Sequence, residues 1–149
     1  MLEDHEMTND DTDLKQTILG LYEGWRNALA TRRYDWFERH LTEDYTMTAH
    51  PFANIYLNKQ KFIEVDKLIT EFDMNILDLF VHRMGNIVVS NVVIQMVKET
   101  FASHPGANFP TAEKLGELLT GKKLVYSSAW RNENGIWKCF DHHLVCPLT

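Results

Sequence analysis

The strongest constraint on the fold lies near the C-terminus, where two strand-like runs flank the dipeptide Asn134-Gly135. Residues 122–131 and 136–146 are rich in β-branched and aromatic side chains, a pattern typical of strands. Asn-Gly is the strongest short signal for a two-residue hairpin turn, because both residues tolerate positive φ. The sequence therefore predicts a β-hairpin over residues 122–146.

The first half of the chain shows the periodicity of helices. Apolar residues recur at three- and four-residue spacing over residues 13–29, after a start at Asp13 that resembles a capping box. Shorter helices are expected over about 34–41 and over 58–69, the latter capped by Asn58. The sequence therefore predicts three N-terminal helices.

Strand patterns dominate the remainder. Residues 45–50, 72–83 and 87–99 alternate or are β-branched, and the last two runs are close enough to form a hairpin. A connection over 103–121 contains two prolines and a short helix capped by Thr111. Connections of this length are often lids or interface elements.

Because the helices segregate from the strands, we predict an α+β fold with three N-terminal helices packed on a strongly curved, mostly antiparallel sheet. A chain of 149 residues is long enough for one sizeable core. We expect residues 1–12 to be a flexible acidic leader and residues 13–149 to be a single domain.

Charge and hydropathy exclude several classes of partner. The net charge is −6, and no run of Lys and Arg is longer than two, which argues against binding to nucleic acid or to an anionic membrane. No apolar stretch approaches the roughly 18 residues of a membrane span. The acidic start of the chain is unlike a signal peptide, so we expect a cytoplasmic protein.

No motif indicates a metal or a cofactor. His142 and His143 are neighbours on a predicted strand and face opposite sides, so they cannot share an ion. The same argument separates Cys139 from Cys146, which we expect to be reduced thiols. No glycine-rich phosphate loop follows a strand. We therefore expect no metal and no cofactor.

Three stretches resemble the nuclear transport factor 2-like superfamily, which includes ketosteroid isomerase and the SnoaL-like cyclases. LTEDY at 41–45 resembles a segment that leads into the first strand of that family, and AHPF at 49–52 resembles an isomerase motif. AWRNENGIWK at 129–138 resembles the last hairpin of calmodulin-dependent kinase association domains. The resemblance runs from residue 13 onward and implies a cone-shaped α+β fold with a pocket.

The expected hairpin register selects residues for that pocket. A two-residue turn at Asn134-Gly135 places Ser127 opposite His142 and Ala129 opposite Phe140. Ser127, Phe140 and His142 then share a small, apolar face, and the resemblance implies that this face lines the pocket. A three-residue loop would instead shift the register by one position.

The opposite face of the hairpin carries larger and more polar side chains, among them Trp130 and His143. Such a face suits packing against a second subunit, so we predict a homodimer through the outer face of the sheet. Cys139 falls on this outer face.

Two further candidates follow from the AHPF motif. His50 falls at or within one position of the isomerase's catalytic base, and a neutral imidazole is a competent general base at neutral pH. The sequence does not decide whether the His50 side chain faces the pocket. By alternation it lies on the same side of the strand as Thr46 and Thr48, and not with the more apolar Tyr45, Met47 and Ala49. Phe52 is a candidate for the pocket wall.

The first helix adds Tyr22 and Trp25, which share its apolar stripe. Trp25 falls near the family position of a Tyr that donates to an oxyanion. Because an indole cannot transfer a proton, we expect Trp25 to form part of the pocket wall. Tyr22 has the phenol that an oxyanion donor needs. Both residues are also consistent with a plain aromatic core, which is the more common place for such side chains.

These candidates predict a cofactor-independent enzyme for proton transfer (isomerase, dehydratase or cyclase) on a small apolar or aromatic carbonyl compound. His50 would be the general base and His142 a second acid/base, with Tyr22 and Ser127 as oxyanion donors. The sequence shows no paired carboxylates, which favours the alternative of a non-catalytic ligand-binding or dimerisation module.

Overall fold

The computed structural model describes residues 9–49, 55–106 and 109–148 of the chain, and it confirms the α+β class. In chain order the elements are α1 (Asn9–Thr31), α2 (Asp35–His40), β1 (Leu41–Ala49), β2 (Ile55–Asn58), α3 (Lys59–Asp66), β3 (Ile69–Met84), β4 (Ile87–Phe101), α4 (Ala112–Leu119), β5 (Lys123–Glu133) and β6 (Ile136–Leu148). His50 and Phe52 lie outside the described residues.

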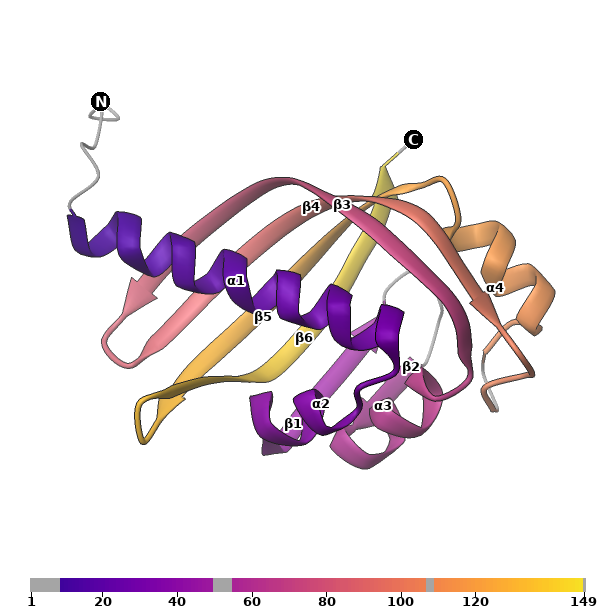
Figure 1. Ribbon diagram of the computed structural model, residues 1–149, viewed down its shortest axis with the longest axis horizontal. Helices are drawn as coiled ribbons and strands as arrows, with labels where there is room; N and C mark the ends of the chain where they lie inside the picture. Colours follow the sequence, from indigo (N-terminus) through magenta and orange to yellow (C-terminus); the bar gives the residue numbers. More distant parts are fainter. Residues whose placement is uncertain (1–8, 50–54, 107–108, 149) are drawn as a thin grey trace.

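The strands form one curved sheet in the order β2-β1-β6-β5-β4-β3. Every neighbouring pair is antiparallel except β1 and β6, which are parallel. Figure 1 shows α1 crossing one face of this sheet, with α2 and α3 near β1 and β2 and with α4 beside β4. The core lies between α1 and the concave face that the sheet presents to it.

Capping signals in the sequence located the starts of α3 and α4. The Asn58 side chain accepts a hydrogen bond from the backbone N–H of Lys61 at 2.9 Å, and Thr111 Oγ1 accepts one from Lys114 at 3.2 Å. Both predicted caps are confirmed. The predicted start of α1 at Asp13 was wrong, because the helix begins at Asn9 with polar residues that the apolar periodicity does not reach.

The last hairpin turns where it was expected to, at Asn134 (φ 55°) and Gly135 (φ 85°). Its register then departs from strict alternation, because β6 has a β-bulge at Phe140. Beyond the bulge Ser127 pairs with His143 instead of His142, and Ala129 pairs with Asp141 instead of Phe140. The predicted pairing was therefore wrong by one residue.

The bulge changes which side chains face the core. Ser128 and Trp130 are buried there together with His142, whereas Ser127 alternates to the outer face. Phe140 lies under the Arg131 guanidinium, with its ring centroid 5.0 Å from Cζ. Placing Trp130 on an outer dimer face was wrong, because its side chain is fully buried.

Cys139 is also fully buried, opposite Trp130, rather than on the outer face as predicted. An aromatic cluster around Trp25 fills this part of the core, with ring centroids 5.4 Å from Phe37 and 5.6 Å from Phe62. The edge-to-face angles of 82° and 69° are the arrangement that aromatic quadrupoles favour.

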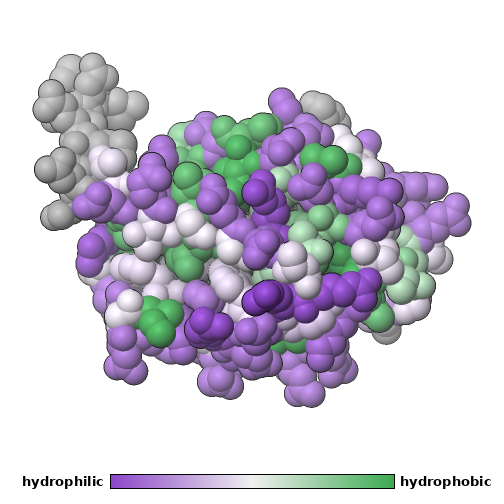
Figure 2. Space-filling model, in the orientation of Figure 1, coloured by the Kyte–Doolittle hydropathy of each residue, from purple (hydrophilic) through white to green (hydrophobic). Residues whose placement is uncertain are grey.

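The face of the molecule that carries α1 is mainly hydrophilic, with hydrophobic residues scattered in small groups (Figure 2). Within the described residues, the helices are too short or too polar to cross a bilayer.

Candidate functional site

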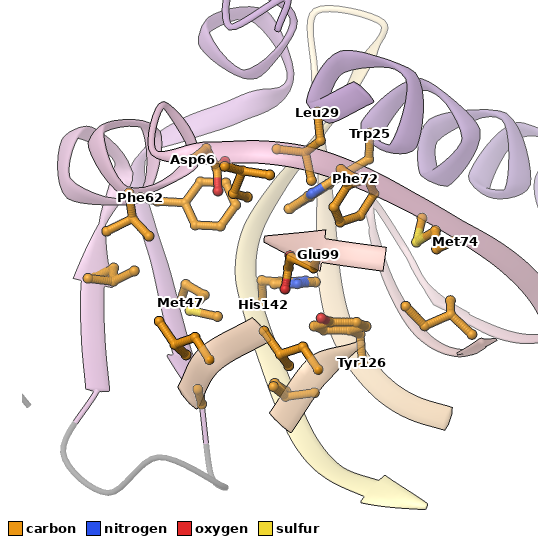
Figure 3. A pocket seen from close by; sticks show the side chains of 18 of the residues that line it. Trp25, Leu29, Met47, Phe62, Asp66, Phe72, Met74, Glu99, Tyr126 and His142 are labelled. Atoms are coloured by element: carbon orange, nitrogen blue, oxygen red, sulfur yellow. The ribbon is translucent and has the colours of Figure 1, made fainter. Parts of the chain in front are cut away.

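A cavity of about 100 Å³ lies between the helices and the concave face of the sheet (Figure 3). Its wall is mostly apolar and aromatic, with α1, α3, α4 and all six strands contributing. The polar or titratable side chains that line it are Tyr22, Asp66, Glu99, Tyr126 and His142. The volume is smaller than the roughly 150 Å³ of an apolar cavity that holds benzene, so a ligand must be small.

Two carboxyl groups face this cavity. Asp66 ends α3 and Glu99 lies in β4, and their side chains turn toward the interior in Figure 3. Asp66 is only 5% exposed and Glu99 only 7%. Asp66 Oδ2 has no hydrogen-bond partner, an unusual state for a buried carboxyl oxygen.

Neither carboxyl forms an ion pair within the described part of the chain. Lys67, next to Asp66, places Nζ 5.7 Å from the ring centroid of Tyr34. Lys98, next to Glu99, pairs with Glu71 at 2.9 Å. Among the described residues that line the cavity none is Lys or Arg, so the two acids have no internal counter-charge.

Burial without a counter-charge makes both acids weak. Desolvation raises the pKa of Glu99 to about 8. Desolvation also raises the pKa of Asp66 well above its ordinary range, and the charge of Glu99 raises it further. At neutral pH both groups hold their protons. The pKa of Glu99, however, is close enough to neutral pH for this carboxyl to gain and lose a proton easily.

The backbone of Glu99 is fixed by one side chain. Thr120 Oγ1 accepts from the Glu99 N–H at 3.1 Å and donates to the Glu99 carbonyl oxygen at 3.2 Å. This double contact joins β4 to the end of α4. The connection over 103–121 thereby becomes part of the site, and its residues Phe109, Leu115 and Leu119 form one wall of the cavity.

His142 lies between two aromatic rings, with centroid distances of 4.6 Å to Trp25 and 4.8 Å to Tyr126. Its Nδ1 is 2.9 Å from Ser128 Oγ. Burial, assisted by His143, lowers the pKa of His142 to about 3. The imidazole is therefore neutral at physiological pH and can donate one hydrogen bond and accept another.

Tyr22 is held by a buried network at the bottom of the site. Its hydroxyl lies 2.7 Å from Ser90 Oγ, which also accepts a hydrogen bond from Trp130 Nε1 at 2.8 Å. Burial raises the pKa of Tyr22, while hydrogen bonding to Ser128 and Ser90 acts in the opposite direction. The phenol stays protonated.

The structure places three of the predicted site residues, Tyr22, Trp25 and His142, in the wall of one cavity. The predicted pocket positions of Ser127 and Phe140 were wrong, because the bulge in β6 removes both residues from the lining.

The sequence reading missed Asp66, Glu99 and Tyr126. Asp66 could have been found, because it lies four residues after Phe62 on the helix face that was expected to be buried. Glu99 carries no such signal, since a bulge in β4 decides which way it faces. Tyr126 shares its face of β5 with Trp130, the face that the sequence assigned to the outside.

No family model and no curated protein matches the chain. Similar folds are found among solved structures. An NTF2-like protein from Cytophaga hutchinsonii superposes with a TM-score of 0.70 at 16% identity, covering 94% of this chain and 99% of the other. A proposed dehydratase of the NTF2-like family from Streptomyces avermitilis gives 0.66 at 15% identity, covering 95% and 99%.

The association domain of CaMKII from C. elegans is also similar, with a TM-score of 0.67 at 13% identity, covering 92% of this chain and 98% of the other. Neighbours of the fold thus include a proposed enzyme and a domain named for association. The helices on an open, mostly antiparallel sheet of six strands, together with these superpositions over almost the whole chain, show that the protein has the nuclear transport factor 2-like fold.

Proposed function

We propose that the protein catalyses cofactor-independent proton transfer, of the isomerase, dehydratase or cyclase type, on a small apolar carbonyl compound bound in the cavity. The observation that carries the proposal is Glu99, a buried carboxyl that faces an apolar cavity and has a pKa of about 8. General acid–base catalysis is most efficient when the pKa of the catalytic group is near the working pH. The proposed dehydratase among the structural neighbours supports this class of reaction.

In this scheme the Glu99 carboxylate removes a proton from the carbon next to the carbonyl group. The electron pair of that C–H bond forms a carbon–carbon double bond, and the carbonyl oxygen takes up the negative charge of an enolate. Return of the proton from Glu99 to a different carbon of a conjugated enolate completes an isomerisation, whereas return to the same carbon regenerates the substrate; either step restores the carboxylate.

His142 is suited to donate a hydrogen bond to the enolate oxygen. When Ser128 donates to Nδ1, Nε2 carries the ring hydrogen, and a neutral imidazole can donate it as a hydrogen bond without giving up a proton. Trp25 and Tyr126 hold the ring in place from both sides. His50 stays a prediction from the sequence.

Proton exchange in deuterated water tests the proposal. Small ketones and aldehydes, beginning with butanone, are incubated with the protein, and loss of the α-proton signal is followed by NMR. Glu99→Gln keeps the shape of the side chain but cannot accept a proton. We expect the exchange rate of this variant to fall roughly a hundred- to ten-thousandfold.

Glu71→Gln is the matched control, because Glu71 is exposed and pairs with Lys98 outside the cavity. Equal exchange rates in Glu99→Gln and the unmodified protein would contradict the role of Glu99. No exchange of any carbonyl probe would contradict the proposed reaction itself.

The association domain among the neighbours favours a second role, that of a dimerisation module. On the outer face, Val93 lies opposite Val125, and Asn91 lies opposite Ser127. Small, uncharged side chains of this kind suit flat packing of one sheet on another. We propose a homodimer through this face, which is compatible with catalysis in the cavity.

A further inference from the structure

The proposed reaction makes no use of Asp66, although this residue is the more unusual of the two acids. Its side chain is buried, turns toward the cavity, and leaves Oδ2 without a hydrogen-bond partner (Figure 3). A buried carboxyl oxygen in this state costs free energy unless a ligand supplies the missing donor. The position is therefore built for a ligand that carries a hydrogen-bond donor.

The surroundings indicate that this donor is positively charged. Glu99 is close enough to raise the pKa of Asp66 by charge repulsion, and the lysines beside both acids are engaged elsewhere, on Tyr34 and Glu71. A cation beside Asp66 would stabilise its carboxylate and allow Asp66 to ionise. A neutral hydroxyl would supply the hydrogen bond but not the charge.

The remaining wall also suits a small cation. Aromatic side chains line the cavity beside the acids, among them Trp25, Phe62, Phe72 and Tyr126 (Figure 3). The face of an aromatic ring attracts an ammonium group within about 6 Å, and the attraction is larger where water is excluded. The imidazole of His142 is neutral, so it does not repel a cation.

We infer that the natural ligand carries a primary amine beside its carbonyl group, and that Asp66 binds this amine as an ammonium ion. The inference rests on the proposed function in taking the same cavity as the substrate site. The substrate class is accordingly that of small, otherwise apolar amino ketones and amino aldehydes. The cavity volume of about 100 Å³ limits the ligand to the size of benzene or less.

Binding of an amine would be coupled to release of a proton. Free Asp66 is protonated at neutral pH, and it must lose its proton to form an ion pair with the ammonium group. The titratable groups that face it are Glu99, Tyr45 and Tyr126, whereas β3 and α4 present only apolar side chains to the cavity. Affinity for amines should therefore rise with pH while the amine stays protonated.

Isothermal titration calorimetry with butylamine and butanol tests this inference. The two probes match in size and differ in charge at pH 7. We expect butylamine to bind at least tenfold more tightly than butanol. We also expect close to one proton to be released per butylamine, measured by comparing phosphate and HEPES buffers.

Asp66→Asn should lower the affinity for butylamine at least tenfold and abolish proton release, while changing the affinity for butanol far less, because only the amine depends on the charge of Asp66. Glu64→Gln is the control, because Glu64 lies on the same helix and pairs with Lys61 at the surface. Equal affinity for both probes, no binding of butylamine, or proton release that survives Asp66→Asn would overturn the inference.

This result is separable from the test of the proposed function. Butylamine binding without proton exchange on any ketone would refute the reaction but keep the amine site. Exchange on butanone without binding of butylamine would refute the amine site but keep the reaction.

Discussion

Asp66 and Glu99 face one cavity, and the charge of Glu99 adds to the effect of burial in raising the pKa of Asp66, although one ends α3 and the other lies in β4. Their meeting depends on a β-bulge at Val97, where β4 has one residue more than β3. Met96, before the bulge, is buried; strict alternation from it would turn Lys98 inward and Glu99 outward. The bulge reverses this, so that Glu99 faces the cavity and Lys98 pairs with Glu71 at the surface.

The two acids should make stability depend on pH. The pKa of Glu99 rises from an ordinary 4.5 to about 8 on folding. Between these values the folded protein keeps a proton that the unfolded chain has lost, so the free energy of unfolding falls as pH rises, by at most about 1.4 kcal/mol per pH unit for each such group.

Urea denaturation from about pH 5 to pH 8 measures this dependence. Glu99→Gln should remove part of the slope, and Asp66→Asn should do the same, because neither replacement can ionise. Glu71→Gln should keep the slope of the unmodified protein. An unchanged slope in both cavity variants would show that these acids do not hold raised pKa values.

His142 should make the free energy of unfolding depend on pH in the opposite sense, and it should do so in acidic solution. Its pKa falls from an ordinary 6.5 to about 3, so between these values the unfolded chain binds a proton that the folded protein does not. Stability should therefore drop as pH falls from about 6.5 toward 3. His142→Gln should weaken this drop, while His143→Gln, one residue away on the outer face, should weaken it much less, because burial is the larger cause of the lowered pKa of His142.

Nitrogen NMR of the imidazole gives a direct check, because the ring of His142 should stay neutral down to about pH 4. Protonation of that ring near pH 6.5 would contradict the environment described for it.

The serine network should be important for stability. Ser90→Ala removes the partner of two buried groups, the Tyr22 hydroxyl and Trp130 Nε1. Trp130 Nε1 loses its partner, which costs about 1–3 kcal/mol, and Tyr22 keeps only its interaction with Ser128, so we expect a loss of roughly 2–4 kcal/mol in the free energy of unfolding. Ser127→Ala, on the outer face, should change it by less than about 0.5 kcal/mol.

Chemical denaturation of both variants measures the difference. Equal stability of Ser90→Ala and Ser127→Ala would contradict both the network and the register of the last hairpin.

Local signals predicted much of the fold. The turn at Asn134-Gly135 and the caps at Asn58 and Thr111 were identified correctly, because each depends on residues only a few positions apart. The bulges at Val97 and Phe140 could not be predicted, since they depend on how neighbouring strands fit a curved sheet. Each bulge exchanges the two faces of its strand.

This explains which part of the candidate site was found. Tyr22 and Trp25 follow from helical periodicity, which no bulge disturbs, and the structure puts both in the cavity wall. Ser127 was assigned to the pocket because the pairing with β6 was taken to be free of bulges. Glu99 faces the cavity only because of the bulge in β4, so the sequence did not show it as a partner of Asp66.

The outer face of the sheet should control assembly. Val93→Asp puts a second charge beside Asp78, next to the patch formed by Val125, Asn91 and Ser127. We expect light scattering to show a dimer for the unmodified protein and a monomer for this variant, because burying an unpaired charge costs several kcal/mol. Gln60→Asp, on the exposed side of α3, should leave the dimer intact. A monomeric unmodified protein would exclude this interface.

The pH dependence of proton exchange on butanone tests the account most directly. If Glu99 is the base, the exchange rate should increase with pH as its carboxyl ionises and should level off above about pH 8. Glu99→Gln should have a low rate at every pH. No exchange at any pH, or a profile that Glu99→Gln reproduces, would contradict the assignment of this cavity as a site of acid–base catalysis.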